Sequence, residues 1–446
     1  MDFMTGGVLC VVLLLLLMAT GLQIGLSFLC AGLAVSTLLL DFDSSLSLLG
    51  KAAYHSIATP TWACIPLFIL MGSFAAEGGF ASRAYRGVHA LSHRLPGSLM
   101  IATCFSSAVF GAVSGSSIAT TAIFGKMAIP EMLRFRYDKA FSVGCIASAG
   151  TFASMIPPSM MMVIYALFTQ QSVGKLFAAG IVPGAITAVV YSVLIITKVK
   201  RNPDIAPHIK ELNTDTPFFE QQAARRKEIF QIWPVVLIAC IVLGGIYSGL
   251  FTPTEAAAAG ALSTLVLGWF LGSFRKLEQV TLSMKGSANT TAMLFLINIG
   301  ALFYSRILAV TRMPTEMSMF LNNLNLPPFV ILMGVLIIML LLGMIMVPVG
   351  IYALTLPVVF PLITSLGYDP IWFGVIALKL TEIGAITPPV GLNVFAMKGV
   401  IPRDANITIE DIFKGCWPFC LCDIIVLIAL ILFPKITLWL PGLLLG

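Results

Sequence analysis

The sequence predicts an all-α polytopic membrane protein that contains one structural unit twice. Hydrophobic residues make up 58% of the 446 residues and charged residues only 10%, which is too little charge to cover a soluble globule of this length. Five positions recur at a constant offset of 361−130, that is 231 residues: Pro130, Tyr137, Asp138, Pro157 and Pro158 return as Pro361, Tyr368, Asp369, Pro388 and Pro389. Secondary transporters are often built from inverted repeats around a central site, so we expect two inverted repeats here.

Charge and cysteine content exclude several other classes of protein. The net charge of +6 is spread over loops without a dense basic stripe, which gives no support for nucleic-acid binding. The interval from Lys198 to Arg226 is rich in Lys and Arg, so the positive-inside tendency places a loop at 198–229 in the cytoplasm. Cys416, Cys420 and Cys422 lack paired CxxC spacing, which favours packing between helices over a metal site.

The first repeat begins with an amphipathic stretch and continues as a broken apolar segment. Arg83 to Leu95 has an apolar stripe beside arginines, which predicts an arm helix lying along the membrane interface. Gly97 to Met132 is apolar but is interrupted by Ser114-Gly115-Ser116-Ser117, which predicts a hairpin that enters the membrane and turns back. Irregular backbone is tolerated at that depth only beside protein or a water-filled cavity, so we expect the hairpin tip to line a site.

Consecutive prolines then break a helix in each repeat. Pro157-Pro158 removes two N–H donors, which should leave the carbonyls of Ala153 and Ser154 without their usual partners. By the same argument Pro388-Pro389 should free the carbonyls of Gly384 and Ala385, and Met346 to Gly350 should break the second hairpin. The expected geometry is two hairpin tips that face two unwound helices.

Such a geometry favours a cation beside an anion. Backbone carbonyls and Ser or Thr hydroxyls offer oxygen ligands to a hard monovalent cation without adding charge, so sodium is the natural candidate. The N-termini of half-helices carry partial positive charge, which favours an anionic substrate next to the cation. The alternative is a pair of proline kinks with packing glycines.

Polar groups inside the apolar runs are further candidates for the site. Lys379 and Glu382 lie three residues apart, and either a mutual ion pair or contact with substrate explains them. Asn393 follows the second break as an uncharged polar residue that could be a ligand or a substrate contact.

Four segments resemble the large membrane subunit of tripartite ATP-independent periplasmic (TRAP) transporters. They are Gly111–Ser117, Ile156–Ser159, Phe251–Ala258 and Thr387–Asn393. The resemblance covers nearly the whole chain and implies an elevator-type transporter in the bacterial inner membrane, embedded in lipid and coupled to sodium, with no organic cofactor. It also implies a separate small four-helix membrane subunit and a periplasmic binding protein that delivers an organic anion, a carboxylate or a sulfonate.

Carried over position by position, the resemblance implies two sodium sites and a substrate site. The residues are Ser114, Ser116, Gly150 and Pro157 for one sodium, Pro348, Gly350, Gly384 and Thr387 for another, and Ser117, Ser159 and Asn393 for the substrate. The second hairpin tip has no Ser-rich run, so the equivalence of the two sodium sites stays open. For Glu255, a position in the first turn of a helix capped by Thr252 or Thr254 is a sufficient explanation.

The expected organisation has five parts, in which the repeats move against a static scaffold. They are scaffold helices at 1–80, the first repeat at 81–180, scaffold helices with the cytoplasmic loop at 181–275, the second repeat at 276–402, and a C-terminal scaffold helix at 403–446.

Two rival functions remain open. A single-component elevator-type anion transporter would need no binding protein, and an intramembrane enzyme would need a nucleophile beside a base, for which the sequence offers no motif.

Overall fold

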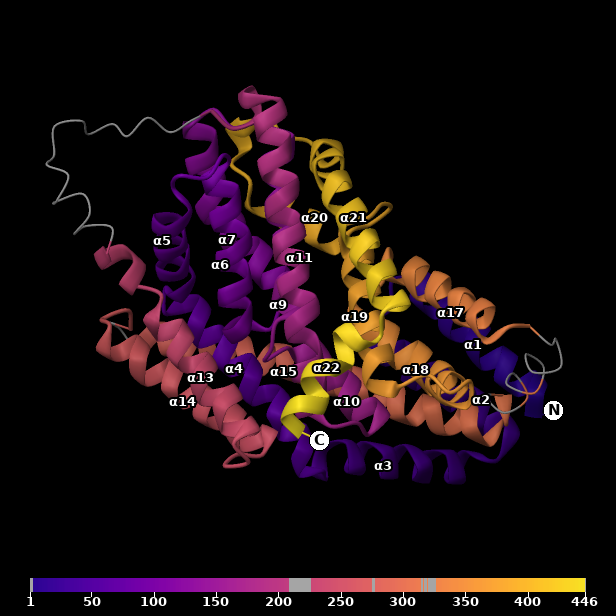
Figure 1. The fold of residues 1–446 in the computed structure, drawn as a ribbon. Coiled ribbons are helices and arrows are strands. Elements are labelled where there is room, and N and C mark those ends of the chain that lie inside the picture. Colours follow the sequence, from indigo (N-terminus) through magenta and orange to yellow (C-terminus); the bar gives the residue numbers. More distant parts are fainter. Residues whose placement is uncertain are drawn as a thin grey trace, which may run out of the picture.

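The computed structural model describes residues 3–207, 226–274, 277–313, 316, 319 and 326–445, which form helices joined by turns and short loops. The α-helices are α1 (Phe3–Ala19), α2 (Ile24–Leu39), α3 (Phe42–Ala58), α4 (Cys64–Glu77), α5 (Phe80–Ser92), α6 (Ser98–Ser114), α7 (Ser117–Arg134), α8 (Lys139–Ala149), α9 (Phe152–Met155), α10 (Met160–Thr169), α11 (Val173–Arg201), α13 (Trp233–Tyr247), α14 (Pro253–Phe270), α15 (Leu277–Val310), α17 (Pro328–Gly343), α18 (Pro348–Ser365), α19 (Pro370–Ala385), α20 (Leu392–Val400), α21 (Ile409–Leu432) and α22 (Lys435–Leu445). Figure 1 shows their arrangement.

Helix length and composition fit a membrane protein. Within the described residues, 6 helices are long and apolar enough to cross a membrane, or up to 7 if a bent pair counts as one span. The bent pair joins Lys139–Met155 to Met160–Thr169 at an angle of 45°. Shorter apolar helices, among them α6 and α17, accompany these spans. The prediction of an all-α polytopic membrane protein is confirmed.

The sequence repeat corresponds to a repeat in local structure. The helices α6, α7 and α10 reappear at the constant offset as α17, α18 and α20. Asp138 and Asp369 each cap the following helix by accepting hydrogen bonds from its first backbone N–H groups. In the turn before each cap, the N–H of Tyr137 bonds the carbonyl of Met132 at 3.0 Å, and the N–H of Tyr368 bonds that of Ile363 at 3.2 Å.

The offset extends beyond the expected repeat ends at 180 and 402. The last residue of α11, Arg201, corresponds to Leu432, the last residue of α21. These two helices contact each other, and Figure 1 shows them side by side in the middle of the molecule. The helix α21 also packs along α8 and α19, so it covers the broken helices of both repeats.

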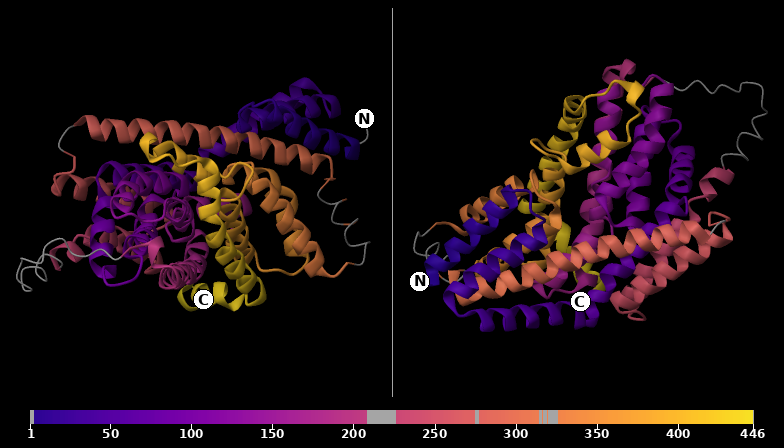
Figure 2. Two further views of the ribbon diagram at one scale, coloured as in Figure 1. Left: turned by 90° about the horizontal axis from the view of Figure 1, so that it is seen from above. Right: turned by 180° about the vertical axis from the view of Figure 1, so that it is seen from behind.

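The helices α2, α3, α4, α13, α14 and α15 pack mainly with one another. The 34-residue α15 crosses one face of the molecule, where Figure 2 shows it over its whole length, and it contacts α2, α3 and α4. The helix α14 packs against α4 and α13. Thr252 and Glu255 form a capping box at the start of α14, so the structural explanation of Glu255 is confirmed.

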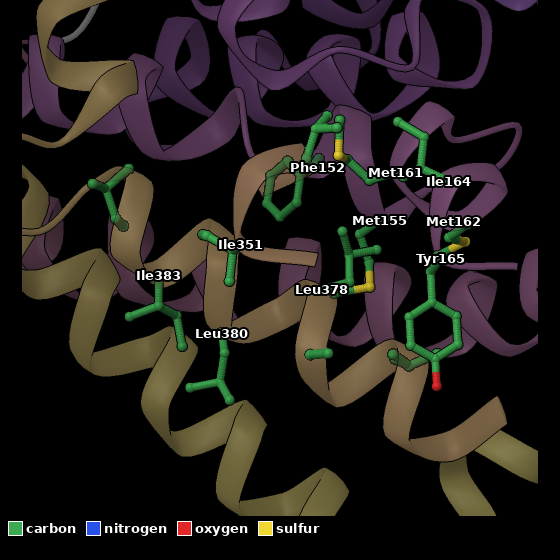
Figure 3. Close-up of a cluster of buried hydrophobic side chains, with 14 of the residues drawn as sticks. Phe152, Met155, Met161, Met162, Ile164, Tyr165, Ile351, Leu378, Leu380 and Ile383 are labelled. Atoms are coloured by element: carbon green, nitrogen blue, oxygen red, sulfur yellow. The ribbon is translucent and has the colours of Figure 1, made fainter. Parts of the chain in front are cut away.

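A buried apolar cluster joins the two repeats. Figure 3 shows Phe152, Met155 and Met161 of the first break next to side chains of α18 and α19. Tyr165 of α10 is also buried, and its hydroxyl donates a hydrogen bond of 2.7 Å to the carbonyl of Pro370 at the start of α19. The first break therefore packs directly on the helix that leads to the second.

Glycine allows α8 and α21 to approach closely. A methyl group built on Gly144 would lie 2.0 Å from the carbonyl carbon of Gly415, and one built on Gly415 would lie 1.8 Å from the carbonyl oxygen of Ala140. Both distances are to backbone atoms, which cannot move aside as a flexible side chain can. A residue larger than glycine therefore forces the two helices apart.

We expect Gly144→Ala to destabilise the protein by about 1–3 kcal/mol, the usual cost of overpacking. Gly334→Ala in α17 is the matched control, because a methyl group there meets nothing within 4 Å. Thermal unfolding of the purified variants in detergent measures the difference. Equal stability of the two variants would contradict the close packing of α8 on α21.

Candidate functional site

The first hairpin turns within two residues. The helix α6 ends at Ser114, and Gly115 follows with a φ of 63°, a left-handed conformation that glycine adopts without strain. Ser116 caps α7 by accepting a hydrogen bond of 3.4 Å from the N–H of Ala119. The Ser114 hydroxyl accepts a bond of 3.4 Å from the Thr120 hydroxyl. The serines predicted at this tip therefore form the turn itself.

The first break leaves backbone carbonyls without donors. The chain passes from α9 through Ile156, Pro157 and Pro158 to Ser159, which caps α10. In the described part of the chain, the carbonyls of Ala153 and Ser154 accept no hydrogen bond. The prediction for this break is confirmed, because prolines occupy the positions that would supply the donors.

The hairpin tip and the first break are in contact. A methyl group on Gly115 would lie 3.2 Å from the nitrogen of Met160 and 3.3 Å from the carbonyl oxygen of Pro158. One on Gly150 would lie 3.0 Å from the carbonyl oxygen of Ser117, so the end of α8 meets the start of α7. The structure thus brings the tip serines, Gly150 and the proline break together.

A cavity of about 160 Å³ opens beside this tip. Ser114, Ser116 and Pro158 line it together with Gly72 and Ser73 of α4. Pro157 does not line this cavity. It faces a separate apolar pocket between α6, α11 and α13. The predicted sodium-binding residues of the first repeat therefore border two different spaces.

The second break differs in its hydrogen bonding. The carbonyl of Gly384 accepts a bond of 3.1 Å from the N–H of Thr387, so the prediction that this carbonyl is free was wrong. The chain turns tightly after α19, and a bond between residues three apart replaces the one that Pro388 cannot make. The carbonyl of Ala385 accepts no hydrogen bond within the described residues, as expected.

The second hairpin tip also meets its break. The N–H of Val390 donates a bond of 3.3 Å to the carbonyl of Met344, and Gly384 packs against the backbone of Gly343. Pro348 occupies the first turn of α18, where its missing N–H has no helical partner to lose. A methyl group on Gly350 would meet Ile24 of α2 at 3.1 Å, so this side of Gly350 faces α2.

The three candidate substrate residues lie near the breaks. Ser117 is the first residue of α7, and Ser159 is fully buried at the cap of α10. Asn393 of α20 is fully buried and donates a bond of 3.3 Å to the carbonyl of Ala147 in α8. Its side-chain oxygen has no partner among the described residues. All three are therefore placed close to an unwound segment of backbone.

A buried ion pair links α19 to α21. The Lys379 ammonium lies 2.6 Å from the Asp423 carboxylate and donates a second bond, of 3.2 Å, to the Thr187 hydroxyl of α11. The Tyr191 hydroxyl donates a bond of 2.7 Å to the other oxygen of Asp423. The sequence left open an ion pair between Lys379 and Glu382. That interpretation is wrong, because Lys379 pairs with Asp423 instead.

The sequence analysis missed Asp423 and the two residues of α11 that join its ion pair, Tyr191 and Thr187. A signal was present, since Asp423 is an acidic residue inside an apolar run, and such residues usually have a partner. Glu382 is 2% exposed, and neither of its oxygens has a hydrogen-bond partner in the described part of the chain. Among the described residues, no group of three or more His, Cys, Asp or Glu side chains is placed to hold a metal ion.

Comparisons with known proteins identify relatives along the whole chain. The family model described as "Tripartite ATP-independent periplasmic transporter, DctM component" matches residues 11–436. The C4-dicarboxylate TRAP transporter large permease protein DctM of Pseudomonas aeruginosa is 36% identical over 411 residues, which is 92% of this chain and 92% of that protein. The isethionate TRAP transporter permease protein DctMQ of Oleidesulfovibrio alaskensis is 31% identical, over 94% of this chain and 63% of that protein.

A solved structure shares the fold. The YdaH transporter of Alcanivorax borkumensis superposes with a TM-score of 0.63 and 16% sequence identity, over 92% of this chain and 90% of that one. At this identity the likeness concerns the fold alone.

We expect the Lys379–Asp423 pair to behave as a unit when it is mutated. Lys379→Met alone leaves a buried carboxylate unpaired and should destabilise the protein by about 3–5 kcal/mol. Adding Asp423→Asn removes that charge and should recover part of the loss. Thermal unfolding of the two single variants and the double variant measures the coupling. Additive losses would show that the two groups do not interact.

Proposed function

The chain belongs to the DctM family of large permease subunits of TRAP transporters, and from this premise we propose that it imports a small organic anion together with sodium. Family membership makes it a transporter permease rather than an enzyme. The observation that carries the proposal is the contact between each hairpin tip and a proline-broken helix.

The first sodium site lies near Ser114, Ser116, Gly150 and the break at Pro157. The unpaired carbonyls of Ala153 and Ser154 support it, because unwound backbone of this kind coordinates sodium in secondary transporters. The nearby serine hydroxyls add oxygen ligands without charge, which suits a hard cation.

The second sodium site lies near Pro348, Gly350, Gly384 and Thr387. Here the carbonyl of Ala385 is the one without a hydrogen bond, while that of Gly384 already accepts the N–H of Thr387. A carbonyl oxygen has two lone pairs, so Gly384 keeps one for a cation. We therefore expect the second site to depend on the turn after α19 more than on the hairpin tip.

The substrate anion binds between the two hairpin tips, next to Ser117, Ser159 and Asn393. Ser117 and Ser159 lie at the N-termini of α7 and α10, where unpaired N–H groups and the helix dipole favour negative charge. The unpaired side-chain oxygen of Asn393 leaves this residue a hydrogen-bond acceptor for a substrate hydroxyl. The relatives named for C4-dicarboxylates and isethionate suggest a carboxylate or a sulfonate.

Transport proceeds by an elevator movement of two inverted repeats, each with a re-entrant hairpin, against a scaffold of α1 to α4 and α13 to α15. The expected boundaries put α15 in the second repeat, and α21 with most of α11 in the scaffold. We now propose that α15 belongs to the scaffold, because it packs on α2, α3 and α4, and that α11 and α21 move with the repeats. Two observations support the movement of α11 and α21 with the repeats. The ion-pair network connects both helices to α19, and α21 packs closely on α8.

Two partners complete the system. TRAP systems include a periplasmic binding protein, which would deliver the anion, and a small membrane subunit. We propose that the small subunit is a separate four-helix chain that contacts the scaffold. The greater length of the DctMQ relative, of which this chain covers 63%, is consistent with a further component in that protein.

We expect uptake of labelled C4-dicarboxylate or isethionate into proteoliposomes to require a sodium gradient and the binding protein. The liposomes hold this chain with its small subunit, and the cognate binding protein is added outside. Undiminished uptake in sodium-free buffer with a proton gradient would refute sodium coupling. Equal uptake without any binding protein would favour the single-component transporter instead.

Pro157→Ala together with Pro158→Ala should weaken sodium binding by about tenfold, because restored N–H donors can bond the carbonyls of Ala153 and Ser154. Pro234→Ala is the control, since Pro234 lies in the first turn of α13, where a missing N–H costs nothing. Sodium-dependent thermal stabilisation of the purified chain is the measurement. Wild-type sodium affinity in the double variant would mean that the prolines only kink the helix.

A further inference from the structure

Glu382 is a buried carboxylate that neither the family resemblance nor the proposed sites explain. It lies in α19, one turn before the second break, and is 2% exposed. Neither carboxylate oxygen has a hydrogen-bond partner among the described residues. The hydroxyls of Ser154 in α9 and Ser117 in α7 lie near it but do not hydrogen-bond it. The carboxylate thus points from the second repeat toward the first break.

The charges around Glu382 do not neutralise it. Lys379 is on the same helix, but its ammonium lies 2.6 Å from Asp423, so one positive and one negative charge cancel there. Tyr352 of α18 also faces Glu382, and its hydroxyl has no hydrogen-bond partner in the described part of the chain. Glu382 therefore has no fixed counterion of its own inside a membrane protein, where an uncompensated ion costs several kcal/mol.

The position of this charge matters for an anion transporter. Ser117 faces Glu382 and is also a candidate substrate contact. An anion bound at Ser117 would be close to a buried carboxylate, and two like charges repel strongly where water is excluded. A cation between them would remove the repulsion and give the carboxylate a partner.

We propose that Glu382, Ser117 and Ser154 form a further sodium site, which adjoins the one at the first proline break. The ligands are one carboxylate and two hydroxyls, the oxygen donors that a hard cation prefers. Because the site adjoins the substrate position, a sodium ion there would offset the repulsion between Glu382 and the anion. This inference rests on the proposed function, since it assumes a sodium-coupled anion transporter.

Glu382→Gln tests the site because it removes the charge and keeps the shape and the hydrogen-bonding capacity. The purified full chain is titrated with sodium chloride, with choline chloride holding the ionic strength constant, and thermal unfolding reports binding. The half-saturating sodium concentration should rise by about tenfold or more. In proteoliposomes with the small subunit and binding protein, the Hill coefficient of uptake for sodium should fall by about one.

Glu77→Gln is the matched control, since it makes the same chemical change on an exposed carboxylate at the end of α4. It should retain wild-type sodium affinity and Hill coefficient. Ser154→Ala supplies a second test if Glu382→Gln does not fold. It should weaken sodium binding in the same direction, and unchanged affinity would overturn the proposal.

The outcomes separate this inference from the proposed function. Wild-type sodium affinity and Hill coefficient in Glu382→Gln would overturn the site and leave sodium coupling intact. Unchanged sodium affinity together with a lost pH dependence of uptake would assign the position to a proton, which also overturns it. Wild-type protein that responds to sodium in neither assay would refute the proposed function and this inference with it.

Discussion

A membrane protein must satisfy its backbone hydrogen bonds internally, and the proline breaks violate that requirement at two places. At the first break the carbonyls of Ala153 and Ser154 have no donor, so this segment has to be shielded from lipid. Close packing provides the shield. Gly111 of α6 allows the hairpin to approach Ala153, and Gly180 of α11 allows that helix to approach the carbonyl of Met155. The hairpins and the paired helices α11 and α21 provide the protein surface that covers the breaks.

The same constraint determines the chemistry of the site. Unpaired carbonyls and hydroxyls gather where two helices are broken, and we propose that they bind a cation without a net negative charge of their own. The charged side chains of Lys379 and Asp423 connect helices instead of forming this site. Lys379 and Asp423 tie α19 to α21, and the Tyr191 hydroxyl adds α11 to the network. Glu382 is the one charged side chain that is buried without a hydrogen-bond partner in the described residues, which is why we propose it as a coupling site between cation and anion.

Much of this architecture can be predicted from the sequence because prolines and a constant offset are local signals. A Pro-Pro pair removes two N–H donors from its helix in any context, so both breaks could be placed by residue number. Hydrogen bonds that depend on how the chain folds in space could not be predicted in this way. The turn that returns Thr387 to the carbonyl of Gly384 appears only in the fold. The partner of Lys379 lies on another helix, which spacing along one helix cannot reveal. The match of α11 to α21 was missed because few of their residues are identical at the offset.

The ratio of sodium ions to anions transported in one cycle tests the account most directly. It can be measured in proteoliposomes from the membrane potential at which a known sodium gradient produces no net flux of anion. Two broken helices that each bind a cation predict more than one sodium ion per anion. A ratio of one or less would contradict the claim that both breaks are coupling sites.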